Sequence, residues 1–203
     1  MAATATHLRI EPSILYFGTP VVLLSTLNED GTPNLAPMSS AWALGYTVML
    51  GLGQSGKTIE NLRRTGECVI NLPAASLWRH VEQLAPLTGR EPVPESKTSQ
   101  FRFEPRKFEA AGLTAQPSER VAPPRVAECA LQLEATVAAI HPFGEDEDAA
   151  AVEARVVRVH AASEIVVEGT NHVDPARWTP LLYVFRHYVA AGERLGRTFR
   201  AEV

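Results

Sequence analysis

Hydrophobic and polar residues alternate in short runs along the N-terminal third of the chain, a pattern typical of β-strands. The run VVLLSTLN at 21–28 ends in Glu29-Asp30-Gly31, and Asp-Gly is a strong signal for a tight hairpin turn. The sequence therefore predicts that TPNLAPMSSAWAL at 32–44 returns antiparallel to the first run. YTVMLGL at 46–52 predicts a further strand.

Helical periodicity is confined to two short stretches that follow. KTIENLRRT at 57–65 and SLWRHVEQLAPLTG at 76–89 place apolar residues at helical spacing, and Gly66 is a typical C-cap for the first helix. ECVINLP at 67–73, between them, predicts a buried strand.

Proline then interrupts the pattern over residues 86–125, where little periodicity remains. We interpret this segment as an ordered excursion rather than a second core. With 203 residues the chain suits a single domain, 1–203, whose core covers about 12–190.

Strands return in the C-terminal part. ECALQLEATVAAI at 128–140 and AVEARVVRVHAA at 151–162 alternate in character, and the acidic run at 141–150 predicts a solvated hairpin tip between them. A short strand is predicted at 163–169 and a last apolar one at 179–189. Six or seven mostly antiparallel strands with two or three short helices favour a barrel or sandwich over a doubly wound sheet.

Composition narrows the function classes. The chain is 45% hydrophobic and 21% charged, and its net charge of -4 argues against a nucleic-acid binder. Its N-terminus has no apolar signal region and no run long enough to span a bilayer, so we expect a cytoplasmic protein without a membrane segment. Cys68 and Cys129 lie in apolar, strand-like runs and are predicted to be buried free thiols.

GLGQSGKT at 51–58 matches the nucleotide P-loop pattern G-x-x-x-x-G-K-[ST]. A P-loop NTPase also needs a long helix that crosses to a parallel strand, and a separate Asp for Mg²⁺. Here the helix is short, and the one Asp that closely follows a long early apolar run, Asp30, belongs to a hairpin turn. These features argue against an NTPase.

The same loop still suits an anion such as a phosphate monoester. Small residues let backbone N–H groups approach it, and the following helix offers its positive end. Lys57 then supplies a mobile cation and Thr58 a hydroxyl. The alternative is a glycine-rich turn with a solvated lysine.

Polar residues also interrupt the run at 32–44. Asn34, Ser39 and Ser40 are costly to bury without partners, and Pro37 cannot donate to a strand ladder. A flat polar heterocycle would satisfy them, and an edge strand with solvated serines is the alternative.

Together these segments resemble the flavin reductase-like family, of the flavoredoxin and flavoprotein oxygenase reductase-component type. Its members have a strand ending in Ser/Thr-Thr, a D-G turn, N-x-A-P-x-S, a K-T-x-x-N-[LI] helix and a T-G-E-x-V-[VI]-N-L strand. The matching residues here are Ser25-Thr26, Asp30-Gly31, Asn34, Ala36-Pro37, Ser39, Lys57-Thr58, Asn61-Leu62 and 65–72. Many members insert Asp between the Lys and the Thr, which are adjacent in this chain.

The resemblance implies a mainly β fold, the FMN-binding split β-barrel, which is antiparallel, of Greek-key type, and has a few short helices. It implies FMN held between strand and loop, at a homodimer interface. The phosphate would meet the loop and helix residues Ser55, Lys57, Thr58 and Asn61. The ribityl and ring groups would meet Thr26, Asn34, Leu35, Ala36, Pro37, Ser39 and Ser40, while Trp42 either stacks near the ring or packs in the core.

The resemblance further implies transfer of hydride from NADH or NADPH to FMN, and of electrons to a flavin, a quinone, a metal complex or a partner monooxygenase. His187 is the candidate catalytic residue and Arg186 a candidate partner for a nucleotide phosphate, although both suit an ordinary strand end. His172 and Asp174 form too sparse a pattern for a metal, and none is predicted. An FMN-binding electron carrier without NAD(P)H activity is the alternative function.

Overall fold

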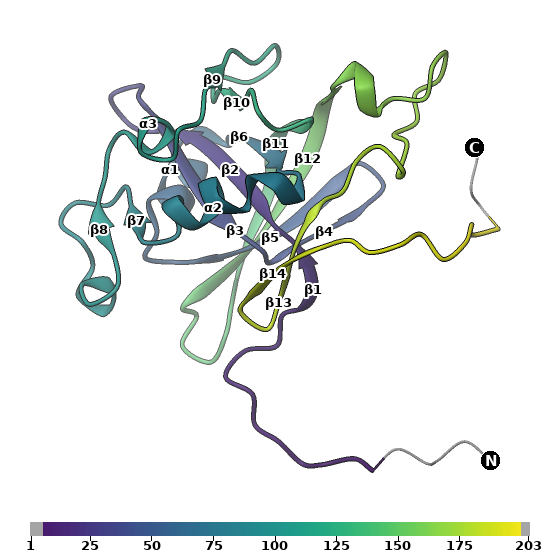
Figure 1. The fold of residues 1–203 in the computed structure, drawn as a ribbon. Helices are drawn as coiled ribbons and strands as arrows, with labels where there is room; N and C mark the ends of the chain where they lie inside the picture. The colour runs from purple at the N-terminus through teal and green to yellow at the C-terminus, as the bar shows by residue number, and fades with distance from the viewer. Residues whose placement is uncertain (1–5, 200–203) are drawn as a thin grey trace.

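Seven strands form the main sheet, in which every neighbouring pair is antiparallel (Figure 1). The computed structural model describes residues 6–199. In sheet order the strands are β3 (Pro33–Met38), β2 (Val22–Leu27), β6 (Glu67–Leu72), β11 (Leu131–Phe143), β12 (Ala149–Ala161), β5 (Thr47–Gly53) and β4 (Ala41–Leu44).

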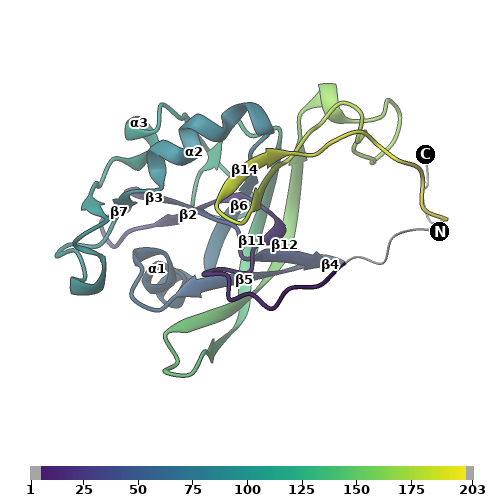
Figure 2. The same cartoon turned by 60° about the horizontal axis from the view of Figure 1, so that its bottom comes forward.

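The two edge strands of this sheet, β3 and β4, follow each other in the chain and are separated only by Ser39 and Ser40. Because an extended chain advances at most about 3.6 Å per residue, their facing ends lie within about 11 Å. The sheet therefore curls into a barrel that stays open between β3 and β4 (Figure 2). The prediction of a mainly β, antiparallel barrel with a few short helices is confirmed.

The prediction of one continuous return strand at 32–44 is wrong. β3 pairs with β2, whereas β4 pairs with β5 at the other edge of the sheet. Pro37 has no N–H to donate, and the chain turns away from β2 just after it. The carbonyl of Ser40 instead accepts a hydrogen bond from the backbone N–H of Gly51 at 2.7 Å.

A second, three-stranded sheet contains β1 (Phe17–Pro20), β13 (Leu181–Val184) and β14 (His187–Ala190). The apolar run at 179–189 is thus a hairpin rather than one strand. Its two turn residues, Phe185 and Arg186, have φ of 41° and 70°, which are unusual values for bulky side chains. The strand predicted at 163–169 is also wrong: a 3₁₀ turn, η3 (Ser163–Ile165), precedes a single bridge between Val166 and Val173.

The helices lie outside the sheet (Figure 2). They are α1 (Lys57–Thr65), α2 (Trp78–Leu84), which follows the 3₁₀ turn η1 (Ala75–Leu77), and α3 (Lys107–Ala110). As predicted, Gly66 caps α1 in the left-handed region, with φ of 68°. The predicted helix at 76–89 is confirmed in its first part.

Two apolar cores share strand β2. Val22 and Leu24 face the first core, inside the barrel, where Ile59 of α1 also packs. Leu23 faces the second core, together with Leu84 of α2 and residues of the 86–125 segment. Cys68 lies in the first core and Cys129 in the second, so both thiols are buried as predicted, and burial raises the pKa of each to about 12.

The proline-rich 86–125 segment covers β3 and α2 rather than standing apart. It contains β7 (Leu87–Thr88) paired with β8 (Arg102–Phe103), the 3₁₀ turn η2 (Glu95–Lys97), α3, and β9 (Ala115–Gln116) paired with β10 (Arg125–Val126). Phe108 and Leu113 fix it to the second core. Its later part is held by a carboxylate in the barrel wall.

That carboxylate belongs to Glu134 on β11, which is fully buried. It accepts hydrogen bonds from the backbone N–H groups of Glu119, Arg120 and Val121 at 2.9, 2.6 and 3.2 Å. Nε2 of His160 lies 2.6 Å from it. Burial alone would raise the pKa of Glu134, but these hydrogen bonds outweigh burial and lower it.

Candidate functional site

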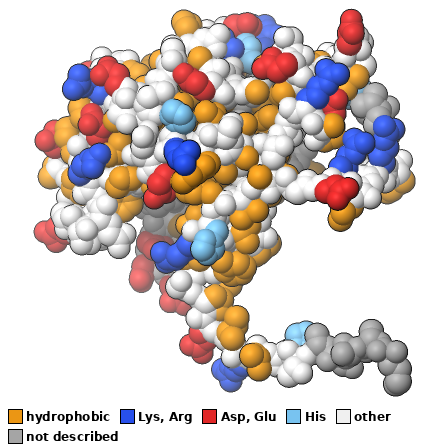
Figure 3. All heavy atoms as spheres, in the orientation of Figure 1, with side chains coloured by type: hydrophobic (Ala, Val, Ile, Leu, Met, Phe, Trp, Pro, Cys, Tyr) orange, Lys and Arg blue, Asp and Glu red, His pale blue; other side chains and the backbone are white. Residues whose placement is uncertain are grey.

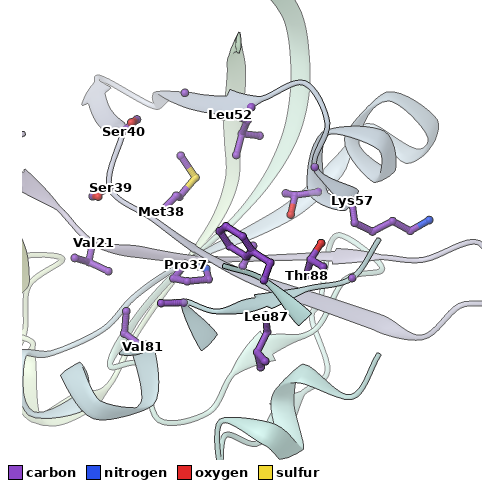
Figure 4. A pocket seen from close by; sticks show the side chains of 18 of the residues that line it. Val21, Pro37, Met38, Ser39, Ser40, Leu52, Lys57, Val81, Leu87 and Thr88 are labelled. Carbon is purple, nitrogen blue, oxygen red and sulfur yellow. The ribbon is translucent and has the colours of Figure 1, made fainter. Parts of the chain in front are cut away.

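A cavity of about 490 Å³ lies where α1 begins, between the β3–β4 crossover and the 86–125 segment (Figure 4). Its walls come from the crossover, the end of β5, the start of α1, α2, and residues 87–107. The volume is in the usual range for an organic ligand. Figure 4 shows the labelled side chains around it, with Met38, Pro37 and Leu52 in one part and Lys57 and Thr88 in another.

Half of the twelve residues predicted to bind the cofactor line this cavity, and the structure brings together strand and loop as the sequence predicted. These residues are Ala36, Pro37, Ser39, Ser40, Lys57 and Thr58. Contact with a cofactor remains a prediction for all of them.

Three other predicted residues, Thr26, Asn34 and Asn61, form a buried network behind the cavity wall. Nδ2 of Asn34 donates to Oγ1 of Thr26 at 3.1 Å and of Thr58 at 3.2 Å. Nδ2 of Asn61 donates to the same Thr26 oxygen at 3.1 Å. This network holds the Thr58 side chain at the start of α1. Leu35 lies next to it on β3 but faces the second core.

Two acceptors of this network are left over. Within residues 6–199, Oδ1 of Asn34 and Oδ1 of Asn61 are both buried without a hydrogen-bond partner. The Asn34 oxygen lies close to the cavity-lining Gly89, where a Cβ would come within 2.6 Å of it. Buried polar atoms without partners are uncommon, so this oxygen marks a point where a ligand hydroxyl group would be accommodated.

The start of α1 borders the cavity. Its N-cap is Gly56, and no side chain within the described part of the chain caps the helix. The first N–H groups of a helix lack intrahelical partners and carry partial positive charge. Gly56, Lys57 and Thr58 all line the cavity, so this end of the cavity suits a phosphate group.

Lys57 differs from the mobile cation that we expected. Its ammonium lies 2.8 Å from Glu29 and 2.6 Å from Glu60. Burial alone would lower the pKa of Lys57, but hydrogen bonds to these two carboxylates raise it. The hydrogen bond from Lys57 also lowers the pKa of Glu29 to about 2. In Figure 4 the Lys57 side chain extends away from Pro37 and Met38. Its charge is thus already compensated within the protein.

Three predicted residues lie elsewhere. His187 lines a neighbouring hollow of about 500 Å³ with Arg186 and Trp78, and Tyr188 borders both this hollow and the main cavity. Ser55 borders a third hollow beside Lys57. Trp42 is 60% exposed on β4, so the alternative that it packs in the core is wrong.

Sequence reasoning missed one wall of the cavity completely. Tyr16, Tyr183 and Tyr188 stand at one side of it, and the hydroxyl groups of Tyr16 and Ser40 are 2.7 Å apart. The 86–125 segment adds Thr88, Gly89, Lys97, Phe101 and Lys107. One sequence signal was available: the chain has only three lysines beside sixteen arginines, and all three lysines line this cavity.

The arrangement also excludes the nucleotide P-loop architecture. α1 leads from β5 into β6, which pairs antiparallel with β2 and β11, so the parallel crossover after the loop is not formed. Residues 6–199 contain no helix long and apolar enough to cross a membrane. They also contain no group of three or more His, Cys, Asp or Glu side chains placed to hold a metal ion.

The barrel and its cavity define a β-barrel protein with a cavity large enough for an organic ligand. The chain matches the family model described as Flavin reductase like domain over residues 14–192, and it belongs to that family. It is therefore a flavin-related oxidoreductase with a flavin cofactor.

The chain is 46% identical over 194 residues to the Uncharacterized protein YdfE of Bacillus subtilis (strain 168), covering 95% of this chain and 93% of that protein. Its structure is similar to that of flavoredoxin of Desulfovibrio vulgaris (Miyazaki F), with a TM-score of 0.77, 22% identity, and 98% and 99% of the two chains covered. It is also similar to nitrilotriacetate monooxygenase component B from Bacillus cereus, with a TM-score of 0.76, 20% identity, and 96% and 100% covered. The fold is the split barrel of flavin reductases.

The residues present fit a flavin. The uncapped start of α1 suits a phosphate, the unpartnered Asn34 oxygen suits a hydroxyl group, and the tyrosines with Phe101 and Leu52 suit an aromatic ring system. Gly89 keeps the space beside the Asn34 oxygen free of a side chain.

Proposed function

We propose that this protein is an FMN-containing reductase that oxidises NADH or NADPH and passes the electrons to a flavin or another acceptor. The observation that carries the proposal is the uncapped N-terminus of α1, with Lys57 and Thr58, at one end of a cavity whose walls also supply several apolar and aromatic side chains. A single terminal phosphate on an aromatic ligand, as in FMN, matches this polarity.

Each part of the site has a task in this proposal. The first-turn N–H groups of α1, the Thr58 hydroxyl and the Lys57 ammonium hold the phosphate. Thr26, Asn34 and Asn61 keep Thr58 in place through their hydrogen bonds. Ser39, Ser40 and the crossover backbone orient the ring system, and the tyrosines exclude water from one side of it. The chemistry that a bound FMN supplies is acceptance of a hydride and delivery of electrons.

The pyridine nucleotide is proposed to enter through the neighbouring hollow. Arg186 offers a guanidinium group for a nucleotide phosphate, and His187 is the candidate for contact with the nicotinamide. Tyr188, which borders both spaces, lies where the two ligands would meet. The similarity to a flavoredoxin and to a monooxygenase component supports a small acceptor or a partner monooxygenase. We also propose a cytoplasmic location.

The proposal is tested by the absorbance spectrum of the purified protein. We expect a flavin spectrum that NADH or NADPH bleaches. Protein that binds FMN but is reduced only by dithionite would favour the electron-carrier alternative. Protein that does not bind FMN at micromolar concentration would refute the proposed function.

Replacing Lys57 with Ala is expected to weaken FMN binding by about 1.5–3 kcal/mol, because one charge-assisted contact to the phosphate is lost. Removal of Lys57 also leaves Glu29 and Glu60 uncompensated beside the phosphate. Fluorescence titration with FMN measures the change, and riboflavin, which lacks the phosphate, should bind equally to both proteins. Arg63→Ala, at the far end of α1, is the matched control. Unchanged FMN affinity would show that Lys57 only anchors Glu29 and Glu60.

A second copy of the chain is the proposed partner for an exposed apolar surface around β4. Trp42, Leu44 and Tyr46 are 60%, 77% and 71% exposed, and β1, with Phe17 79% exposed, contacts β4. Figure 3 shows hydrophobic side chains gathered where the N-terminal segment meets the body of the molecule. Exposed apolar patches of this kind mark interfaces.

Trp42→Glu is therefore expected to convert a dimer into a monomer, because a charge would be buried in the apolar interface. Sedimentation equilibrium measures the mass of both proteins. Phe143→Glu, at an exposed position on the acidic hairpin, should stay dimeric. A wild-type protein that is monomeric with FMN bound would contradict the dimer.

A further inference from the structure

The buried lysine Lys107 is the least explained charge in the described part of the chain. It opens the short helix α3 and is 4% exposed, yet its side chain lines the cavity. Its neighbour Phe108 is anchored in the second core, so α3 is held firmly against β3 and α2. Lys107 is therefore held at the cavity wall by a fixed backbone.

No acidic group in the described part of the chain compensates this charge. Within residues 6–199, the Lys107 ammonium takes part in no ion pair and no hydrogen bond. Burial lowers the pKa of Lys107 to about 8, with a further contribution from the positive charge of Lys97. A buried ammonium without a counter-ion destabilises a folded protein, and such groups are found mainly where a ligand completes them.

Lys97 brings a second cation to the same wall. It ends η2, is half-buried, and its ammonium lies 5.8 Å from the centre of the Phe101 ring. Lys97 and Phe101 both line the cavity. Burial lowers the pKa of Lys97, and the nearby Arg90 lowers it further. No carboxylate within the described range forms an ion pair with Lys97.

Lys57 differs from Lys97 and Lys107 because its charge is already compensated by carboxylates. Lys57 is neutralised by Glu29 and Glu60, and Glu60 also pairs with Arg90. An anion entering the cavity thus meets two unpaired ammonium groups, and both come from the 86–125 segment. Elsewhere the chain uses arginine for its positive charges, and no arginine within residues 6–199 lines the cavity.

We propose that Lys97 and Lys107 form an anion subsite in the cavity that binds a phosphate group of a nucleotide. The phosphate belongs either to FMN itself or to the pyridine nucleotide. This identification of the ligand rests on the proposed function. The 86–125 segment then contributes directly to ligand recognition, in addition to closing the second core.

The first experiment uses inorganic phosphate and protein without flavin. Because the chain has only three lysines, acetylation with acetic anhydride followed by peptide mass spectrometry reports on each of them separately. Phosphate is expected to slow the acetylation of Lys107 and Lys97 several-fold. Lys107→Met should raise the melting temperature of the ligand-free protein, because an unpaired buried charge is removed, and should abolish the rise that phosphate produces.

The second experiment separates the two sources of the phosphate. If it belongs to FMN, Lys107→Met binds FMN about 10- to 100-fold more weakly and riboflavin unchanged. If it belongs to the pyridine nucleotide, FMN affinity is unchanged, and about 10- to 100-fold more NADH or NADPH is needed for half-maximal flavin reduction. Arg106→Met removes the adjacent exposed charge, which pairs with Glu109 at 3.3 Å, and should alter neither quantity.

The subsite is refuted if phosphate leaves the acetylation of Lys107 unchanged and Lys107→Met behaves as wild type toward FMN and both pyridine nucleotides. Wild-type protein that binds neither FMN nor riboflavin would instead refute the proposed function. Protection of Lys107 by inorganic phosphate would in that case still support an anion subsite.

Discussion

Replacing Glu134 with Gln is expected to lower the free energy of unfolding by about 3–5 kcal/mol, the range found when one partner of a buried charged cluster is removed. The fully buried carboxylate accepts three backbone N–H groups of residues 119–121 and contacts His160. A Gln amide has one acceptor oxygen and turns donor hydrogens toward the remaining N–H groups. Denaturant unfolding followed by circular dichroism measures the loss.

Glu119→Gln is the matched control for this substitution. Its side chain is half-exposed and pairs with Arg158 at 3.4 Å, while its backbone N–H still donates to Glu134. Exposed ion pairs contribute about 1 kcal/mol at most, so this variant should remain close to wild type. Equal destabilisation of the two variants would show that the buried carboxylate does not hold the 119–121 segment.

The sign of the pH dependence follows from the lowered pKa of Glu134. In the unfolded chain the carboxyl group titrates near pH 4.3, and in the folded protein it titrates at a lower pH. The stabilisation is therefore complete above about pH 5 and is lost as the pH falls through these values. The difference in unfolding free energy between wild type and Glu134→Gln should shrink correspondingly in acid.

Local sequence signals predicted the strand-to-helix turn at the start of α1 well, because its geometry is local. The loop, Lys57, Thr58 and the first turn of α1 are contiguous, so their positions follow from a strand-to-helix turn. The pairing of Lys57 with carboxylates could not be predicted in the same way from the local sequence. Glu29 reaches it from the hairpin turn 28 residues away, and only the closed barrel brings these two side chains together.

The remaining walls of the cavity depend on packing between distant segments of the chain, which the hydrophobic periodicity of the sequence does not reveal. Lys97 and Lys107 lie in a proline-rich segment whose path is fixed by Phe108 in the second core and by Glu134. Tyr16 and Tyr183 come from opposite ends of the chain and meet through the three-stranded sheet, with ring centres 5.4 Å apart. His187 was predicted from its sequence neighbourhood to contact the nicotinamide or the flavin, and it lies beside the hairpin turn in the hollow next to the main cavity.

Gly51→Val is expected to lower the free energy of unfolding by about 3 kcal/mol, the upper end of the usual cost of overpacking. A Cβ at position 51 would lie 2.8 Å from the Cβ of Ser40, which cannot retreat because its own carbonyl accepts the Gly51 N–H at 2.7 Å. The β3–β4 crossover must therefore move away from β5. Thermal unfolding and FMN titration together measure the effect.

Gly53→Val on the same strand separates this contact from the general effect of placing valine in β5. A Cβ at position 53 meets no atom within 4 Å, and valine suits an extended backbone, so its stability should be within about 0.5 kcal/mol of wild type. Because Ser39 and Ser40 line the cavity, Gly51→Val should also weaken FMN binding at temperatures where the protein is still folded. A Gly51→Val protein with wild-type stability and FMN affinity would mean that the crossover adapts freely. In that case the two-residue link between the sheet edges would not determine the shape of the cavity.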